Sequence, residues 1–325
     1  MRVMPFDQHQ RYEVVGTLAG SMPTVGTPIA LDVGGFFSAA DAGPTLPIRE
    51  VLPAGWRAVT LDRQVPAHGA CQGYTIGDAG RLPFEDGTFD LVSCLDVLEH
   101  VPPEWRAPVM ADLLRVSRGY VVIAVPFADD DAAQRELALS DFLQSALGTD
   151  HPYLEEHRAF GLPTHAALAA ALPDRTWSFG FGNLDRWFAM MLAKHFLLAL
   201  PHAGDPSARL DAAYLQLDRD HDRRGPFYRR YYLTTSGDGV SIDPIASTAD
   251  RYRELDIGSD QPFEPFLAWV FDRLLDAERD RFTDASAQVL RERDEVTALL
   301  RDVEQSNIYK LYRMARAVRS GSRTP

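Results

Sequence analysis

Residues Gly77 to Val101 read GDAGRLPFEDGTFDLVSCLDVLEHV and contain, in order, a polar turn, an apolar run and the start of a helix. The run from Phe89 to Leu95 has the length of a buried strand, and turn-forming Asp and Gly residues precede it. Polar residues follow at once. A short apolar strand that leads directly into a helix is the repeating unit of a parallel α/β sheet.

Further strand-length runs surround this unit and extend the prediction along the chain. An amphipathic helix is predicted from Trp105 to Ser117, and a short one from Thr164 to Leu172. The other predicted strands are Pro28–Val33, Arg57–Leu61, Gln72–Ile76, Gly119–Val125, Thr176–Phe181 and Tyr228–Thr235. The last of them mixes polar and apolar positions, which favours an edge or half-exposed antiparallel strand. We therefore expect an α/β fold, with a Rossmann-like, seven-stranded, mostly parallel sheet and helices on both faces.

Composition excludes several classes of protein. The 325 residues carry a net charge of -13, which argues against general binding to the phosphate backbone of nucleic acids. Two cysteines cannot build a disulfide scaffold. The most apolar segment, Trp187–Leu200, is shorter than the roughly 20 residues that a membrane span needs, so we interpret it as a core or lid helix. We expect a cytoplasmic protein.

The C-terminal part differs in character from the rest of the chain. Leu275, Phe282, Val289, Val296 and Val303 recur at a spacing of seven, which predicts a long helix and is compatible with a homo-oligomeric coiled coil. Five basic residues and no acidic ones follow within 310–325, a composition suited to peripheral contact with an anionic membrane. The predicted divisions are an N-terminal extension (1–27), the α/β domain (28–240), a connector (241–266) and this helical region (267–325).

Acidic residues and glycines lie where the predicted strands end, and in a parallel sheet that edge is where ligands bind. The first strand ends in Asp32, Gly34 and Gly35, and the second strand ends at Asp62. The stretch Gly34-Gly35-Phe36-Phe37-Ser38 lacks the G-x-G-x-x-G pattern that cradles a pyrophosphate. Carboxylates without a phosphate cradle favour a cationic nucleoside such as S-adenosyl-L-methionine.

The stretches ALDVGG (30–35), TLD (60–62) and Gly77–Val101 together resemble class I S-adenosylmethionine-dependent methyltransferases of type 11. The resemblance implies that Asp32, Gly34 and Gly35 line the methionine moiety and that Asp62 holds the ribose hydroxyls. It further implies adenine recognition by Asp78 and Ala79, and it places Leu95 and Asp96 beside the sulfonium. The sequence departs from the family's D-x-G-x-G-x-G at Phe36 and Ser38, so the loop is expected to take another shape.

Histidines are the candidate residues on the acceptor side. In related methyltransferases the segment after the fifth strand folds over the acceptor pocket, which makes His157 and secondarily His151 candidates, one of them as a general base. His100, just after the fourth strand, is a third candidate, although all three have structural roles as alternatives. His151 and His157 with Glu155 or Glu156 match no helical H-E-x-x-H pair, so no metal ion is expected.

The resemblance implies methyl transfer, with a hydroxyl of a sugar or cell-envelope glycan as the favoured acceptor. The basic tail also resembles segments that follow coiled coils in bacterial surface-polysaccharide glycosyltransferases, which suggests a polysaccharide-biosynthesis context. Two alternatives stay open. One is a non-catalytic methyltransferase-like scaffold for polysaccharide assembly, and the other is a methyltransferase of a small metabolite or lipid.

Overall fold

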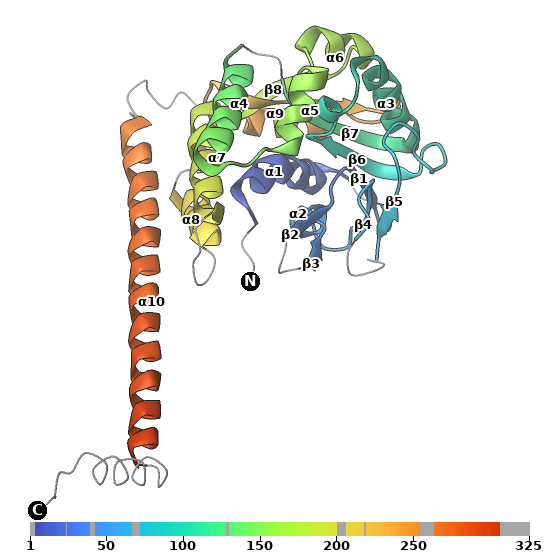
Figure 1. Cartoon of the computed structure of the whole chain (residues 1–325). Helices are drawn as coiled ribbons and strands as arrows, with labels where there is room; N and C mark the ends of the chain where they lie inside the picture. The colour runs from blue at the N-terminus through green and yellow to red at the C-terminus, as the bar shows by residue number, and fades with distance from the viewer. Residues whose placement is uncertain are drawn as a thin grey trace, which may run out of the picture.

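The computed structural model describes residues 4–23, 25–39, 43–66, 72–127, 130–199, 206–217, 219–253 and 263–305. The predicted basic tail lies outside the described residues. Within them, a seven-stranded sheet is covered by helices on both faces, and one long helix extends from one side (Figure 1).

The sheet confirms the predicted Rossmann-like class. Its spatial order is β5 (Tyr74–Ile76), β4 (Arg57–Asp62), β1 (Ile29–Val33), β6 (Phe89–Leu95), β7 (Ser117–Pro126), β9 (Phe227–Thr235) and β8 (Trp177–Asn183). The first five strands are parallel, and β9 runs antiparallel to both of its neighbours. The strand order reverses beside β1, which places the ligand-binding crevice above the carboxyl ends of β1, β4 and β6.

Strand β9 corrects one prediction. It is not an edge or half-exposed strand, because it lies between β7 and β8 and its residues are mostly buried. Three of the polar residues that suggested exposure are in fact buried: Arg229 is 1% exposed, Thr234 is 1% exposed and Thr235 is fully buried. Burial of this guanidinium is possible because it is paired with Asp96, as charged groups inside proteins are.

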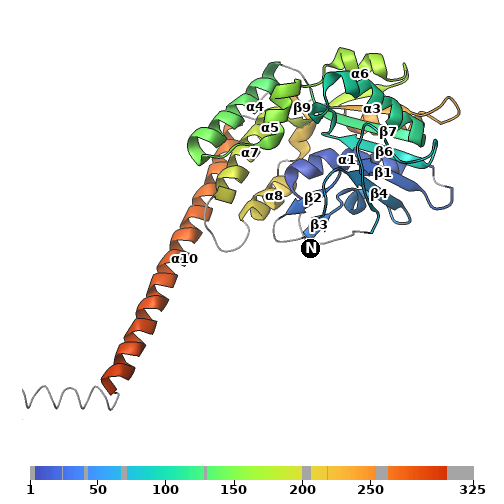
Figure 2. The ribbon, with the colours of Figure 1, turned by 45° about the vertical axis from the view of Figure 1, so that its right-hand side comes forward.

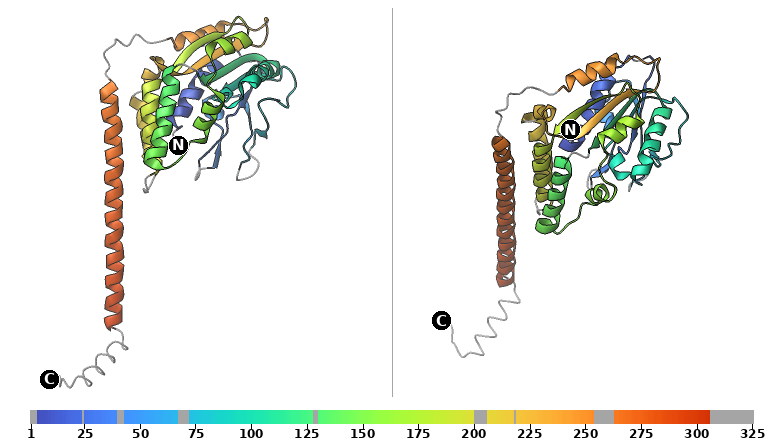
Figure 3. Two further views of the ribbon diagram at one scale, coloured as in Figure 1. Left: turned by 45° about the horizontal axis from the view of Figure 1, so that its top comes forward. Right: turned by 90° about the horizontal axis from the view of Figure 1, so that it is seen from above.

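Two apolar layers cover the sheet. On one face, α3 (Pro103–Val116) and α6 (His165–Ala171) pack against the strands through Val109, Leu113 and Leu168. On the other face lie α1 (Phe6–Ser21), α2 (Ile48–Val51) and α9 (Asp243–Arg251). A small hairpin of β2 (Phe37–Ala39) and β3 (Gly43–Thr45) follows β1. Figure 3 shows the sheet between these layers.

Helices α1 and α9 are parts of this body, which differs from the predicted N-terminal extension and connector. Val14, Val15 and Leu18 of α1 are buried against the sheet, and so are Ile245 and Tyr252 at α9. The segment around α9 is polar in composition because only one narrow side of this short helix faces the core.

A third core lies beyond the carboxyl ends of the strands. It is built from α4 (Asp130–Phe142), α5 (Pro152–Phe160), α7 (Leu184–Ala199), α8 (Pro206–Leu217) and the start of α10 (Phe263–Gln305). The predicted core or lid helix is α7, whose Trp187 and Met190 are buried here. No helix among the described residues has both the length and the apolarity to cross a membrane.

The long helix predicted at the C-terminal end is α10. Phe266 and Val270, near its start, are buried against the third core. Arg209 of α8 pairs with Asp280 at 3.0 Å. Beyond this contact the helix runs away from the body (Figure 2).

Candidate active site

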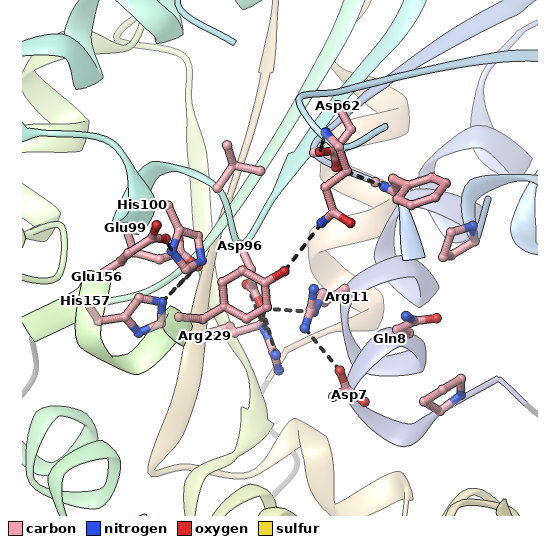
Figure 4. A pocket seen from close by; sticks show the side chains of 18 of the residues that line it. Asp7, Gln8, Arg11, Asp62, Asp96, Glu99, His100, Glu156, His157 and Arg229 are labelled. Carbon is pink, nitrogen blue, oxygen red and sulfur yellow. Dashed lines mark hydrogen bonds and ion pairs between the residues drawn. The ribbon is translucent and has the colours of Figure 1, made fainter. Parts of the chain in front are cut away.

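A cavity of about 670 Å³ opens above the carboxyl ends of β1, β4 and β6, within the size range of small-molecule sites. Its floor is formed by residues that follow these strands and β5. Its walls come from α1 on one side and from α5 and α7 of the third core on the other. Figure 4 shows that carboxylates, guanidinium groups and imidazoles point into it.

Asp62 lies at the end of β4 and lines the cavity. Its Oδ2 accepts a hydrogen bond from the backbone N–H of Phe36 at 3.2 Å, and its Oδ1 accepts one from Gln64 N–H at 3.0 Å. A carboxylate has about four lone-pair positions, so two further donors can be accepted from the cavity. Gly77 and Ala79, after β5, line the same end.

The loop after β1 approaches its surroundings so closely that it requires glycine. Gly34 has φ of +77°, and a Cβ there would overlap Val97. A Cβ on Gly35 would overlap the Asp32 carboxylate and lie 2.7 Å from the Tyr12 hydroxyl. Phe36, at the departure from the family pattern, lines the cavity and packs on Tyr74 with ring centroids 4.9 Å apart.

Three residues predicted at the cofactor site do not line the cavity. Asp32 is fully buried beneath the loop and accepts hydrogen bonds from Tyr12 at 2.8 Å and Ser93 at 2.7 Å. Burial raises the pKa of Asp32 to about 7. Asp78 accepts the Gly80 N–H at 2.7 Å within its own turn, and Leu95 packs in the core.

Asp96 lines the centre of the cavity in the left-handed backbone region, with φ of 52°. The Arg229 guanidinium contacts both of its carboxylate oxygens, at 2.8 and 3.0 Å, and Arg11 Nε lies 2.9 Å from Oδ2. Burial by itself would raise the pKa of Asp96, but the two guanidinium groups hold it below its usual value. Asp96 is therefore an anion between two cations.

The predicted acceptor-side residues His157 and His100 come together at the far end of the cavity. Their Nε2 atoms lie 3.4 Å apart. His157 Nδ1 lies 3.0 Å from Glu136 Oε1, which also accepts the Tyr228 hydroxyl at 2.7 Å. His100 Nδ1 lies 2.8 Å from Glu156 Oε2. Burial and the neighbouring His157 lower the pKa of His100 to about 3.

His151, the third candidate, lines the cavity next to this pair. Its ring packs edge-on against His195 of α7, with centroids 5.2 Å apart. Burial lowers the pKa of His151, so it is held neutral. The structure thus assembles three predicted histidines from two separate segments into one chamber.

Sequence reasoning missed the contribution of α1 and β9. Asp7, Gln8 and Arg11 of α1 reach into the cavity, and Arg229 of β9 forms its back wall. Polar residues on a helix ordinarily indicate a solvated face, so nothing local marked these as site residues. The available signal was the pair of arginines, Arg229 and Arg230, within the aromatic run Tyr228–Tyr232.

Residues 54–123 match the family described as "Methyltransferase domain". Solved structures with low similarity include a putative methyltransferase of an antibiotic biosynthesis pathway from Anabaena variabilis, with 15% identity, 70% of this chain and 99% of that chain covered, and a TM-score of 0.41. The plantazolicin methyltransferase BpumL in complex with SAH is 11% identical, with 71% and 84% covered and a TM-score of 0.43. The Haemonchus contortus phosphoethanolamine N-methyltransferase 2 in complex with S-adenosyl-L-methionine is 12% identical, with 68% and 51% covered and a TM-score of 0.41. No curated protein sequence matches.

Proposed function

Because this chain carries a class I S-adenosylmethionine-dependent methyltransferase domain, we propose that it transfers the methyl group of S-adenosyl-L-methionine to a hydroxyl of a sugar or cell-envelope glycan. The observation that carries the proposal is the continuous cavity, which joins the Asp62 carboxylate to a chamber lined by His100, His151 and His157. The Asp62 end of the cavity suits a nucleoside, and the histidine end suits an acceptor that must lose a proton.

The residues at the strand ends fit the cofactor. Asp62 keeps two acceptor positions on the cavity side for the ribose hydroxyls. Gly77 and Ala79 leave an open wall for a flat base. Arg11 and Asp96 place a positive and a negative charge near the loop. These charges suit the carboxylate and the ammonium group of the methionine moiety of the ligand. When bound, the cofactor supplies a methyl group already activated by the sulfonium.

The histidine chamber fits a hydroxyl acceptor. Polar groups of His100, His151 and Glu156 share the wall with the ring of Tyr153, a combination that can bind both the hydroxyls and the apolar face of a sugar. His157 Nε2 carries a lone pair, because its Nδ1–H donates to Glu136, and this atom lies 3.4 Å from His100 Nε2 at the far end of the cavity. As the acceptor oxygen bonds to the methyl carbon, the carbon–sulfur electron pair stays on sulfur and the hydroxyl proton passes to an imidazole. Such a base contributes roughly 10²- to 10⁴-fold.

Phe36 supports the alternative of a non-catalytic scaffold, since it stands where the family pattern has a second glycine and lines the cavity. Titration calorimetry with S-adenosyl-L-methionine separates the two. We expect binding by the full chain, and a roughly 10- to 100-fold weaker affinity in Asp62→Asn, because hydrogen bonds to a charged group are worth about 1.5–3 kcal/mol. Asp238→Asn, a fully exposed carboxylate, is the control.

A folded chain that binds no cofactor would favour the scaffold. For the acceptor, the methyl label should appear in sugar methyl ethers after acid hydrolysis of cell-envelope polysaccharide incubated with the protein and labelled cofactor. Label recovered only in a lipid or small-metabolite fraction would replace the glycan assignment.

A further inference from the structure

Three side chains at the far end of the cavity are arranged as metal ligands. Glu99 and His100 come from the short 3-10 helix after β6, and His157 comes from α5. One ligand atom from each lies within 4.8 Å of the others. All three line the cavity, with Glu99 fully buried and His157 7% exposed.

The orientation of both imidazoles leaves their Nε2 atoms facing each other. Glu136 holds the Nδ1 side of His157 at 3.0 Å, and Glu156 holds the Nδ1 side of His100 at 2.8 Å. A carboxylate accepts hydrogen bonds, so the contact with Glu136 places the proton on Nδ1 of His157 and leaves a lone pair on its Nε2. The two Nε2 atoms lie 3.4 Å apart, a separation that a single cation or a shared proton between them can bridge.

Glu99 adds a third side chain that can act as a metal ligand. Its side chain is fully buried, and neither carboxylate oxygen has a hydrogen-bond partner among the described residues. Glu99 Oε1 lies 4.0 Å from His157 Nε2. An unpaired buried carboxyl costs free energy, which a bound cation would offset. Figure 4 shows Glu99 beside the two imidazoles.

We propose that Glu99, His100 and His157 bind one divalent transition-metal cation, with zinc as the best fit. Two nitrogens bound to zinc at about 2.0–2.1 Å with tetrahedral angles are roughly 3.4 Å apart, which matches the separation of the two Nε2 atoms. Two histidines and one carboxylate form the ligand set of catalytic zinc sites that keep one position open. Glu136 and Glu156 act as the carboxylates that orient the ligating imidazoles.

The consequence for methyl transfer rests on the proposed function. Because Glu99, His100 and His157 line the cavity, an acceptor hydroxyl that entered it and bound to the cation would lose its proton more readily. Coordination and general-base action use the same lone pairs, so a metal-bound site replaces the imidazole base. Cation binding itself does not depend on the cofactor or the acceptor and is tested without either.

The test is equilibrium dialysis of the full chain, free of any histidine tag, against zinc ions, with cobalt(II) absorption as a second readout. We expect one zinc per chain and visible cobalt bands of a low-coordinate site. Glu99→Gln and His157→Ala should lower zinc affinity at least 100-fold. Glu156→Gln, at the partly exposed second carboxylate, should lower it roughly 10- to 100-fold. His9→Gln, a histidine on α1 away from the cluster, should leave it unchanged.

Circular dichroism of each variant shows whether it folds. Should a variant at a buried position unfold, Glu156→Gln still tests the proposal, because Glu156 is partly exposed. A wild-type chain that binds no zinc at micromolar concentration would overturn the proposal and leave a proton shared between the imidazoles. Equal zinc affinity in Glu99→Gln and wild type would overturn it as well. Cofactor titration in chelator, run in parallel, reports on the proposed function separately.

Discussion

At the scale of single residues, several carboxyl groups of this protein are buried, and their neighbours are either charged arginines or neutral hydrogen-bond donors. Asp96 remains an anion because two arginines lie against it. Asp32 and Asp222 instead meet neutral donors: Asp222 Oδ1 accepts from Tyr214 at 2.6 Å and Gln10 at 2.7 Å, while its Oδ2 has no partner among the described residues. Burial therefore raises the pKa of Asp222 to about 7.

This raised pKa makes stability depend on pH. Between about pH 4 and 7 the folded chain keeps a proton on Asp222 that the unfolded chain releases, so the stabilisation present at low pH is lost as pH rises towards 7. The slope from this group approaches about 1.4 kcal/mol per pH unit. Asp222→Asn, which cannot ionise, should show a flatter dependence in urea unfolding at pH 5, 6, 7 and 8.

Asp220→Asn, an exposed carboxylate two residues away, is the matched control and should retain the wild-type slope. Asp32 contributes a slope of the same sign, so the informative quantity is the difference between variant and wild type. Identical slopes for Asp222→Asn and wild type would contradict the protonated state.

At the scale of elements, the loop after β1 lines the cavity on one side and packs against helix α1 on the other. Its upper surface lines the cavity, and its lower surface rests on the buried Asp32 carboxyl and the Tyr12 hydroxyl of α1. Gly34 N–H also donates to Leu61 O of β4 at 2.8 Å, which fixes the loop against the neighbouring strand. Helix α1 thus supports the cofactor end of the site from below.

Gly35→Ala should disturb both the fold and the site, because its Cβ would overlap the Asp32 carboxylate. We expect about 1–3 kcal/mol of destabilisation in urea unfolding, as for other overpacked sites, together with weaker binding of S-adenosyl-L-methionine by calorimetry. Gly20→Ala at the end of α1 meets no atom within 4 Å and should be neutral or stabilising by up to about 1 kcal/mol. Wild-type stability and affinity in Gly35→Ala would show that the loop adapts.

At the scale of the whole molecule, most large apolar residues of the body are buried in its three cores, whereas α10 exposes a row of them. Leu275, Phe282, Val289 and Val296 recur every seven residues and are between 56% and 75% exposed. A heptad row of this kind is typical of a helix that pairs with another. The companion row is half polar, so we expect self-association of moderate strength.

Replacing Phe282 and Val289 together by Asp should convert a self-associated full-length chain into a monomer, measured by sedimentation equilibrium. The physical reason is that two carboxylates would face a second copy along the apolar seam. Ala287→Asp, on the opposite side of the helix, is the control and should still associate. A monomeric wild-type chain at micromolar concentration would remove the coiled-coil interpretation.

Local sequence determined most of the fold and half of the site. Strand-length apolar runs place Asp62, Gly77 and Asp96 at the carboxyl ends of strands, because parallel strands end at one edge of the sheet. The long C-terminal helix also followed from its apolar period. Burial of β9 could not be predicted, since its Arg229 resembles a solvated residue until Asp96 is placed against it.

The far end of the cavity was decided by tertiary structure alone. His157 and Glu99 are unremarkable in their own segments, and the spacing around His157 predicted no metal ion. Folding brings α5 over the end of β6, so that the Nε2 atoms of His100 and His157, which are 57 positions apart in the chain, lie 3.4 Å from each other. Ligand sets depend on distances between atoms, whereas sequence periodicity reports only which face of an element is apolar, so only the folded chain could show this cluster.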